Sequence, residues 1–278
     1  MAKKKLLIAH LTDFHAGSPY FITNLLTRAI DELNELKPDA VVITGDLTNM
    51  GFRQEFTTAK AFIDKIQCEN IVIVPGNHDA RNVGWVHFEE LFGPRHKVLS
   101  LPKATIVALD SSEPDLDIGS IGRERYVWIR EQFEKNKNDL KIFAMHHHLL
   151  PVPGTGRERN IVYDAGDLLE TLIDSKVDLV LTGHKHVPWF WRFENMIVTV
   201  AATVSSLKLR GYIKPSYHLF EIEGNTISIY RKYPFGEKSL EGAFEKQEFG
   251  TKYLRWVKKD LRELMGLESQ KGEPKPKK

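Results

Sequence analysis

The feature that most constrains the fold is an alternation of short apolar runs and helical patterns along the first eighty residues. Residues 5–11, 41–43 and 71–74 are rich in Leu, Ile and Val, as expected of buried strands. Between these runs, apolar residues recur at helical spacing over residues 22–33 and 54–66, which predicts two amphipathic helices. Strands that alternate with helices form βαβ units, so we expect an α/β fold with a mainly parallel sheet.

The rest of the chain first continues this pattern and then changes. Further strands and helices are predicted at residues 105–109, 123–136, 142–145, 166–175 and 177–182. A loop rich in Pro and Gly over residues 151–160 is interpreted as an active-site lid. After His186 the pattern becomes one of successive short strands separated by turns, which predicts antiparallel pairing at residues 188–193, 196–203, 216–222 and 226–231.

Polar side chains gather where the predicted strands end. The five groups are Asp13 with His15, Gly45-Asp46, Gly76-Asn77-His78-Asp79, His146-His147-His148 and Gly183-His184-Lys185-His186. They contain seven of the eleven histidines, and histidines scattered for packing would not gather in this way. In an extended chain residues i and i+2 point to the same side, so the two members of each Asp-x-His or His-x-His pair are expected to converge. The glycines in three of these groups would let the backbone run close to a crowded centre.

The donor types in these groups predict a transition-metal centre. Carboxylates, imidazoles and one amide, without a thiolate, suit five- or six-coordinate manganese, iron or zinc rather than a tetrahedral structural zinc site. The groups offer more donors than one six-coordinate ion can use while it also holds water, so we expect two ions that share one carboxylate. The remaining positive charge would attract a phosphate group and acidify a bridging water molecule.

The order of these motifs resembles that of the calcineurin-like metallophosphoesterase superfamily. The matching series lies within about residues 5–220 and consists of Asp13-x-His15, Gly45-Asp46, Gly76-Asn77-His78-Asp79, His146-His147 and Gly183-His184-x-His186. The resemblance implies a four-layer αββα sandwich with two mixed β-sheets. It also implies a dinuclear centre of divalent or trivalent transition metals, most often manganese or iron, with zinc as a further candidate.

The resemblance implies which residues hold the metals. The ligands carried over are Asp13, His15 and His186 for one ion, Asn77, His146 and His184 for the other, and Asp46 for both. Three consecutive histidines leave a choice of ligand among His146, His147 and His148. The register of the strand that ends at Met145 favours His146, which leaves His147 near the substrate.

The resemblance gives two further residues a part in catalysis. His78 would face the substrate and donate a proton or a hydrogen bond to a phosphate oxygen or to the leaving group. Asp79 would fix the tautomer of His78. Together with His78, the residues expected to contact the substrate are Asn77 and His147.

Smaller features favour one branch of the superfamily, the class III cyclic nucleotide phosphodiesterases. Met50 occupies the position at which phosphoprotein phosphatases carry a phosphate-binding arginine, and no tyrosine follows Asp46 at the distance that purple acid phosphatases require. Leu109-Asp110-Ser111-Ser112 resembles a segment of the class III group. The expected function is hydrolysis of a cyclic nucleotide or another small phosphodiester by a metal-bridging hydroxide. The alternatives are a nuclease acting on DNA or RNA, a phosphomonoesterase and a non-catalytic scaffold.

Composition adds expectations about location and partners. The single cysteine, Cys68, excludes an internal disulfide, and no apolar run is long enough to span a membrane, so a cytoplasmic protein is expected. We divide the chain into a catalytic domain at residues 1–235, an extension at 236–266 with a basic amphipathic helix over 251–265, and a disordered tail at 267–278. The basic helix would pack on the body of the protein or on a second copy in a homodimer, with nucleic-acid or anionic-membrane contact as the alternatives.

Overall fold

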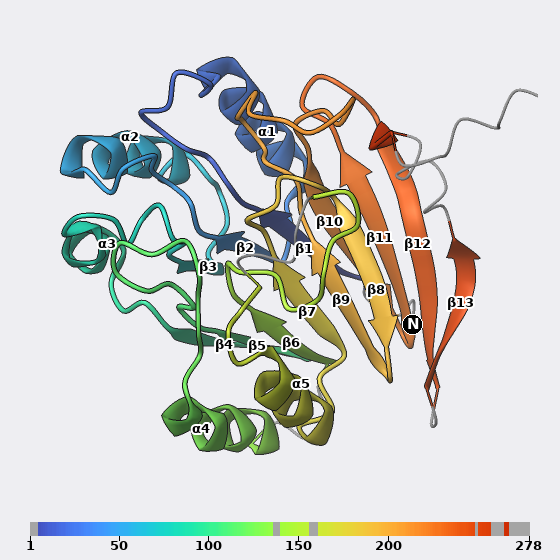
Figure 1. The fold of residues 1–278 in the computed structure, drawn as a ribbon. Coiled ribbons are helices and arrows are strands. Elements are labelled where there is room, and N and C mark those ends of the chain that lie inside the picture. Colours follow the sequence, from blue (N-terminus) through green and yellow to red (C-terminus); the bar gives the residue numbers. More distant parts are fainter. Residues whose placement is uncertain (1–4, 136–139, 156–160, 248–249, 257–263, 267–278) are drawn as a thin grey trace, which may run out of the picture.

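The computed structural model describes residues 5–135, 140–155, 161–247, 250–256 and 264–266. The helices are α1 (Thr23–Leu36), α2 (Arg53–Ile63), α3 (Gly84–Phe92), α4 (Arg123–Glu134) and α5 (Ala165–Asp174). The strands are β1 (Leu6–Leu11), β2 (Ala40–Thr44), β3 (Ile71–Val74), β4 (Lys97–Leu101), β5 (Ala104–Ala108), β6 (Leu140–Ala144), β7 (Leu179–Thr182), β8 (Trp189–Phe193), β9 (Met196–Val200), β10 (Tyr217–Glu223), β11 (Thr226–Lys232), β12 (Lys238–Gln247) and β13 (Gly250–Trp256). Figure 1 shows their arrangement.

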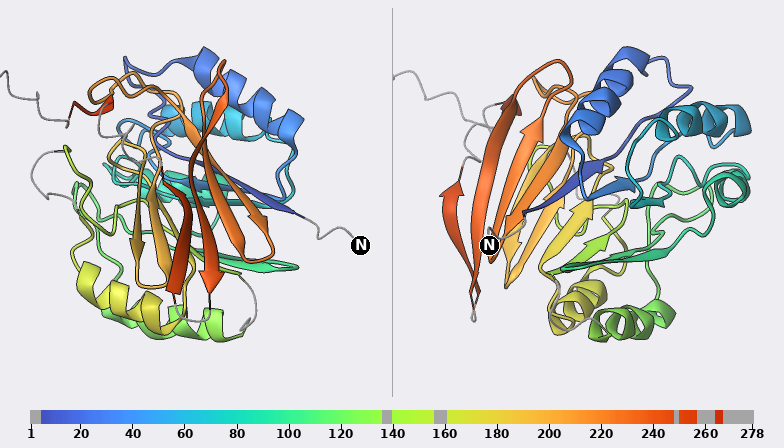
Figure 2. Two further views of the ribbon diagram at one scale, coloured as in Figure 1. Left: turned by 90° about the vertical axis from the view of Figure 1, so that its right-hand side faces the viewer. Right: turned by 180° about the vertical axis from the view of Figure 1, so that it is seen from behind.

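The strands form two mixed sheets that face each other (Figures 1 and 2). The first sheet has the order β13-β12-β11-β10-β1-β2-β3, and only β1, β2 and β3 are parallel in it. The second sheet has the order β4-β5-β6-β7-β9-β8, with a parallel centre and an antiparallel strand at each edge. The expected hairpins are therefore present, but they are divided between the sheets: β8–β9 belongs to the second and β10–β11 to the first.

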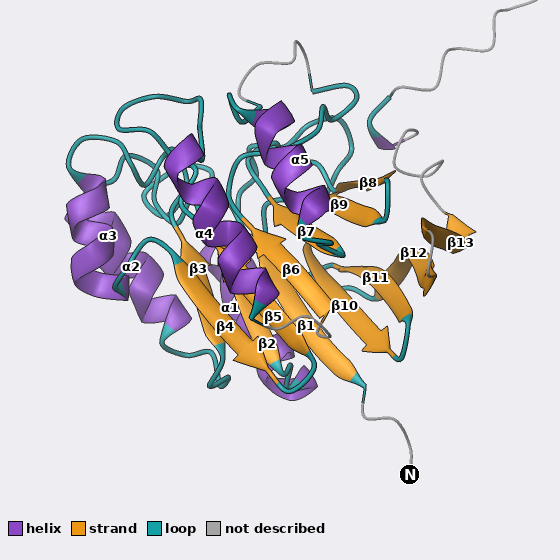
Figure 3. Ribbon diagram, turned by 90° about the horizontal axis from the view of Figure 1, so that it is seen from below, coloured by secondary structure: helices purple, strands orange, loops and turns teal. Residues whose placement is uncertain are grey.

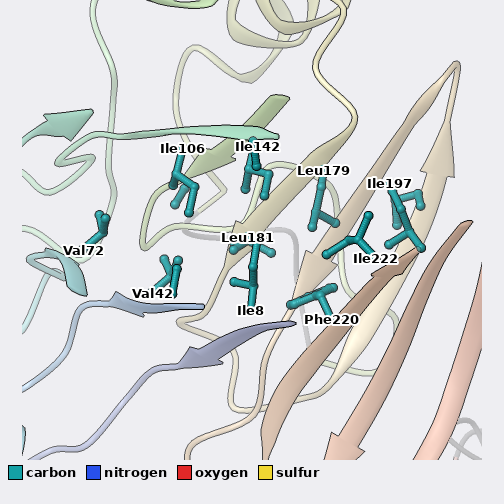
Figure 4. Close-up of a cluster of buried hydrophobic side chains, with 14 of the residues drawn as sticks. Ile8, Val42, Val72, Ile106, Ile142, Leu179, Leu181, Ile197, Phe220 and Ile222 are labelled. Atoms are coloured by element: carbon teal, nitrogen blue, oxygen red, sulfur yellow. The ribbon is translucent and has the colours of Figure 1, made fainter. Parts of the chain in front are cut away.

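Helices cover the outer faces of both sheets (Figure 3), which confirms the four-layer αββα sandwich. Apolar residues of α1, α2 and α3 pack on the first sheet, and those of α4 and α5 pack on the second. The inner faces meet in a third apolar cluster that includes Ile8, Val42, Ile142 and Phe220 (Figure 4). Because the central strands are buried on both faces, their sequences are continuous runs of apolar residues.

The structure differs from the expectation at the C-terminal side of the chain. The prediction of a helix over residues 251–265 is wrong for residues 251–256, which belong to β13 and pair antiparallel with β12. The ring of Tyr253 packs against Phe244 of β12, with 4.8 Å between centroids, so cross-strand contacts override the apolar pattern that suggested a helix. Residues 257–263 and 267–278, which carry the rest of that helix and the expected disordered tail, lie outside the described residues.

Three other elements, α3, β4 and β12, were not expected from the sequence. The expected lid over residues 151–160 is described only as far as residue 155. None of the helices in the described part of the chain combines the length and the apolarity that crossing a bilayer requires.

Candidate metal centre

The two sheets bring the polar groups of the sequence together at one edge of the sandwich. The segments that follow β1, β2 and β3 supply Asp13 with His15, Asp46 and Asn77, and the segments that follow β6 and β7 supply His146, His184 and His186. Parallel strands present their carboxyl ends at the same edge, which is where α/β proteins place their ligand sites. The first group of atoms is Asp13 Oδ1, His15 Nε2 and His186 Nε2, whose pairwise separations are 2.9 Å between the histidines and 3.2 and 3.7 Å to the aspartate.

A second group lies beside the first. Asn77 Oδ1 is 3.1 Å from His146 Nε2 and 3.0 Å from His184 Nδ1, and the two ring nitrogens are 3.2 Å apart. Asp46 stands between the groups, because its Oδ2 is 3.4 Å from His146 Nε2 and 3.7 Å from His15 Nε2. Its other oxygen, Oδ1, accepts a hydrogen bond from the backbone N–H of His78 at 2.8 Å.

The outward hydrogen bonds of these side chains fix which atoms face inward. His146 donates from Nδ1 to the Thr44 carbonyl at 2.7 Å, and His186 donates from Nδ1 to the Lys208 carbonyl at 2.7 Å, so in a neutral ring each Nε2 carries a lone pair. The Asn77 amide donates to Asp117 and turns its oxygen inward. Asp13 Oδ1 is buried and has no hydrogen-bond partner among the described residues. Acceptor atoms that converge in this way suit a cation between them.

The spacing of the inward atoms also fits metal ions. Metal–nitrogen and metal–oxygen bonds of about 2.1 Å at right angles place neighbouring donor atoms about 3.0 Å apart. In the second group, formed by Asn77, His146 and His184 and called the Asn77 group below, the separations of 3.0, 3.1 and 3.2 Å agree with that value. The residues present therefore fit two metal ions with Asp46 between them, one for each group.

Burial and charge act on the titratable groups in opposite directions. Burial raises the pKa of Asp13 and of Asp46, but the neighbouring histidines outweigh it and hold both pKa values well below the usual range. Burial lowers the pKa of His15 to about 4, which favours the neutral ring that a metal ligand requires. For His146 burial lowers the pKa, but Asp46 raises it and the result is about 9. Two anionic carboxylates thus lie among the imidazoles.

The backbone carries strain at the residues that converge. Asp13, His15, Asp46, His184 and His186 all have positive φ, between 51° and 72°. Left-handed conformations are unfavourable for residues with a Cβ and cluster at functional sites. The explanation given from the sequence, that an extended chain aims residues i and i+2 at one point, is therefore wrong. The side chains converge because tight left-handed turns follow the strands.

An open cavity of about 540 Å³ lies over these groups. Its wall includes Asn49 and Arg81. It also includes four residues that the sequence patterns did not single out, because they lie on loops without a periodic signal: Asp117, Lys208, Leu209 and Arg210. Arg81 donates to the Asp117 carboxylate at 2.8 Å. Burial lowers the pKa of Lys185, another residue of the wall, and the charge of Arg210 lowers it further.

Comparison with known proteins identifies the family. The family model described as calcineurin-like phosphoesterase matches residues 6–188, which is more than half of the chain. The chain is a calcineurin-like phosphoesterase. Proteins of this family use divalent metals, and as one of them the protein is a hydrolase.

Curated relatives of this calcineurin-like phosphoesterase are named as phosphodiesterases. A probable cyclic nucleotide phosphodiesterase of Rhodococcus erythropolis is 27% identical over 219 residues, covering 72% of this chain and 71% of the relative. A probable glycerophosphodiester phosphodiesterase, GpdQ, of Arcobacter nitrofigilis is 31% identical over 219 residues, covering 72% and 79%. Both agree with the class III group. A purple acid phosphatase from yellow lupin shares the fold, with a TM-score of 0.66 and 13% identity over 93% of this chain and 55% of that one.

Asp79 has a different part in this calcineurin-like phosphoesterase from the one expected. The Asn49 carbonyl, and not Asp79, accepts the hydrogen bond from His78 Nδ1, at 2.6 Å. The carboxylate of Asp79 instead accepts bonds from the backbone N–H groups of Leu47, Thr48 and Gly76 and from the Thr48 hydroxyl, at 2.8–3.1 Å. Asp79 therefore ties the loop after β3, which carries Asn77, to the loop after β2, which carries Asp46.

The side chains of the three consecutive histidines have different surroundings in the structure. His146 belongs to the Asn77 group, as the strand register predicts. His147 is fully buried and does not line the cavity; its Nδ1 lies 2.9 Å from the Ser111 hydroxyl and its Nε2 lies 3.2 Å from the Asp117 carbonyl. The expected substrate contact of His147 is thus replaced by support of the loop that carries Asp117. His148 is buried and stacks on His184, with ring centroids 5.7 Å apart.

Glycine is required where the two loops of this calcineurin-like phosphoesterase touch, as the sequence predicts. A Cβ on Gly76 would lie 2.3 Å from Asp46 Oδ1 and 2.5 Å from the Asp46 backbone nitrogen. We expect Gly76→Ala to displace Asp46, to lower metal affinity about 10–100-fold and to lower stability by about 1–3 kcal/mol. Isothermal titration with Mn²⁺ and thermal unfolding measure both effects.

The matched control for that substitution is Gly166→Ala at the start of α5, where a Cβ would meet nothing within 4 Å. This variant is expected to bind Mn²⁺ as the wild type does and to be as stable or more so, because alanine is the better helix former. Metal binding that is equal in Gly76→Ala and in the control would show that the close approach to Asp46 does not matter.

Proposed function

We propose that this protein is a phosphodiesterase that hydrolyses small phosphodiesters with the help of two divalent metal ions. The observation that carries the proposal is the position of Asp46, whose Oδ2 lies 3.4 and 3.7 Å from one histidine in each of two groups of inward-facing donors. The phosphodiesterase names of the relatives support the diester as the substrate class.

The two groups divide the metal ligands between them. Asp13, His15 and His186 would hold one ion, Asn77, His146 and His184 the other, and Asp46 would contact both. When bound, the ions supply Lewis acidity toward the phosphoryl oxygens and lower the pKa of water. The donor set accommodates manganese, iron or zinc, and we propose manganese or iron because oxygen donors and imidazoles are mixed and thiolates are absent.

The chain's own residues then position the substrate and move a proton. The bond between His78 Nδ1 and the Asn49 carbonyl holds the ring at the wall of the cavity and commits Nδ1 to donating. In the imidazolium form of His78 the second ring nitrogen, Nε2, also carries a proton, which it would donate to a phosphoryl oxygen or to the leaving alkoxide. The Asn77 amide, held by Asp117, keeps its oxygen toward the second metal group. Donors fixed in advance in this way need no reorganisation as charge develops on phosphorus.

Hydrolysis of bis(p-nitrophenyl) phosphate tests the proposal. The protein supplied with Mn²⁺ is expected to release p-nitrophenol, and exhaustive chelation is expected to lower the rate at least about a hundredfold, with recovery when Mn²⁺ is restored. Cyclic AMP, cyclic GMP and glycerophosphocholine, assayed in parallel, identify the small diester. Hydrolysis that persists after chelation, with no metal left in the protein, would contradict the proposal.

A further inference from the structure

One wall of the cavity carries positive charge that the metal groups do not explain. Lys185, Lys208 and Arg210 all line it. Lys185 is buried, with 7% of its surface exposed, whereas Lys208 and Arg210 are exposed to solvent within the cavity wall. A further cation of the wall, Arg81, lies in an ion pair with Asp117 at 2.8 Å.

The carboxylates of the cavity do not balance the charges of Lys208 and Arg210. Among the described residues that line the cavity, only Asp46 and Asp117 are acidic; Asp117 is paired with Arg81, and Asp46 is proposed to contact the metals. Within the part of the chain that the structure describes, neither Lys208 nor Arg210 forms an ion pair. Cations that face a partly enclosed cavity without a partner raise the local concentration of anions.

The loop that carries Lys208 and Arg210 is fixed at both ends. The backbone N–H of Leu207 donates to the Tyr20 carbonyl at 2.9 Å, and that of Tyr212 donates to the Leu264 carbonyl at 3.0 Å. Between these points the Lys208 carbonyl accepts the 2.7 Å hydrogen bond from His186. The backbone of Lys208 is therefore hydrogen-bonded directly to His186, which belongs to the same donor group as Asp13 and His15. A loop held in this way presents its cations at little entropic cost when a ligand binds.

We infer that this wall binds a second phosphate group of the substrate, so that the preferred substrate is a phosphodiester of nucleotide size that carries a further phosphate. The inference rests on the proposed function, because it places the hydrolysed diester over the metal groups. A simple dialkyl phosphate has one negative charge, which the two metal ions and His78 would already bind. Lys208 and Arg210 would then have no partner, whereas a second phosphate would accept charge-assisted hydrogen bonds from both.

A pair of chromogenic substrates isolates the second phosphate. Thymidine 5′-(p-nitrophenyl phosphate) and its 3′-phosphorylated form share the reacting diester and the leaving group, and they differ by one phosphate. The wild type is expected to hydrolyse the 3′-phosphorylated form with a kcat/KM at least about tenfold higher, since one charge-assisted hydrogen bond has about that effect. The ratio of the two kcat/KM values is expected to fall as ionic strength rises.

Substitutions assign the effect to the wall. The Lys208→Met/Arg210→Met double variant is expected to bring the ratio close to one, and Lys208→Arg is expected to keep it, because the charge remains. Lys214→Met removes an exposed lysine of the same segment that does not line the cavity, and it is expected to leave the ratio as in the wild type. Metal content measured on each variant shows whether the substitution has left metal binding by His186 and its neighbours intact.

The outcomes separate this inference from the proposed function. A wild-type ratio near one, with bis(p-nitrophenyl) phosphate hydrolysed normally, would overturn the inference and leave the phosphodiesterase intact. Failure to hydrolyse any of the p-nitrophenyl esters with Mn²⁺ present would overturn both. A 5′-phosphorylated oligothymidylate added as competitor distinguishes the source of the phosphate: stronger inhibition by the oligonucleotide than by thymidine 3′,5′-bisphosphate would contradict a small substrate.

Discussion

Asp46→Asn is expected to lower kcat/KM for bis(p-nitrophenyl) phosphate by about a thousandfold or more, because metal chemistry supplies several kcal/mol and each 1.4 kcal/mol is about tenfold. In the part of the chain that the structure describes, Asp46 is the residue that lies between the two groups of donors. The amide is uncharged, and an amide oxygen that faces both groups leaves the NH₂ group against the His78 backbone N–H, whose hydrogen bond Asp46 Oδ1 accepts in the wild type. Steady-state kinetics with Mn²⁺, together with metal analysis of the purified variant, measure the loss.

The control for this substitution is Asp64→Asn, which removes an exposed carboxylate from a surface ion pair with Lys60. Surface pairs of this kind contribute at most about 1 kcal/mol to stability, so activity and metal content are expected to stay at the wild-type level. If Asp46→Asn retained two metals and more than about a tenth of the wild-type activity, the shared carboxylate would not be the organising feature of the site.

His78→Ala is expected to lower kcat about 10²–10⁴-fold, the usual contribution of a positioned acid or base, while the metals stay bound. The reason is geometric: the His78 ring lines the cavity and is held by the Asn49 carbonyl, and the backbone N–H that contacts Asp46 remains in the variant. Stopped-flow or steady-state kinetics give kcat, and metal analysis gives the occupancy.

The neighbouring variant Asn77→Ala provides the contrast. The Asn77 side-chain oxygen lies 3.0 and 3.1 Å from two histidines of the second group. Its loss is therefore expected to lower the metal content of the protein, with a smaller effect on kcat measured when metal is saturating. His87→Ala, on α3 and outside the cavity, controls for the removal of an imidazole. A His78→Ala protein that loses a metal ion would reverse the roles assigned to these adjacent residues.

Much of the fold follows from patterns that burial imposes on the sequence. The run Ile71–Val74 and the runs in β1 and β2 are apolar on both faces because helices cover one face and the second sheet covers the other. The donor groups are also visible in the sequence, because the ends of parallel strands meet at one edge and place Asp13, Asp46 and Asn77 side by side.

The parts that could not be predicted depend on contacts between residues far apart in the chain. Asp79 contacts the loop after β2 rather than its neighbour His78, and that choice depends on how two loops fit together. Lys208 and Arg210 reach the cavity because their loop is held against His186, and no local pattern marks this. Strand β13 forms because β12 offers an edge for pairing, although its residues also fit a helical stripe.

Titration of the chelated protein with Mn²⁺, recording bound metal and hydrolysis of bis(p-nitrophenyl) phosphate in the same samples, tests the central claim most directly. We predict that the protein binds two ions per chain, that activity requires both, and that Asp46→Asn loses the second binding event. Full activity with one bound ion, or with none, would contradict a site built from two groups of donors around Asp46.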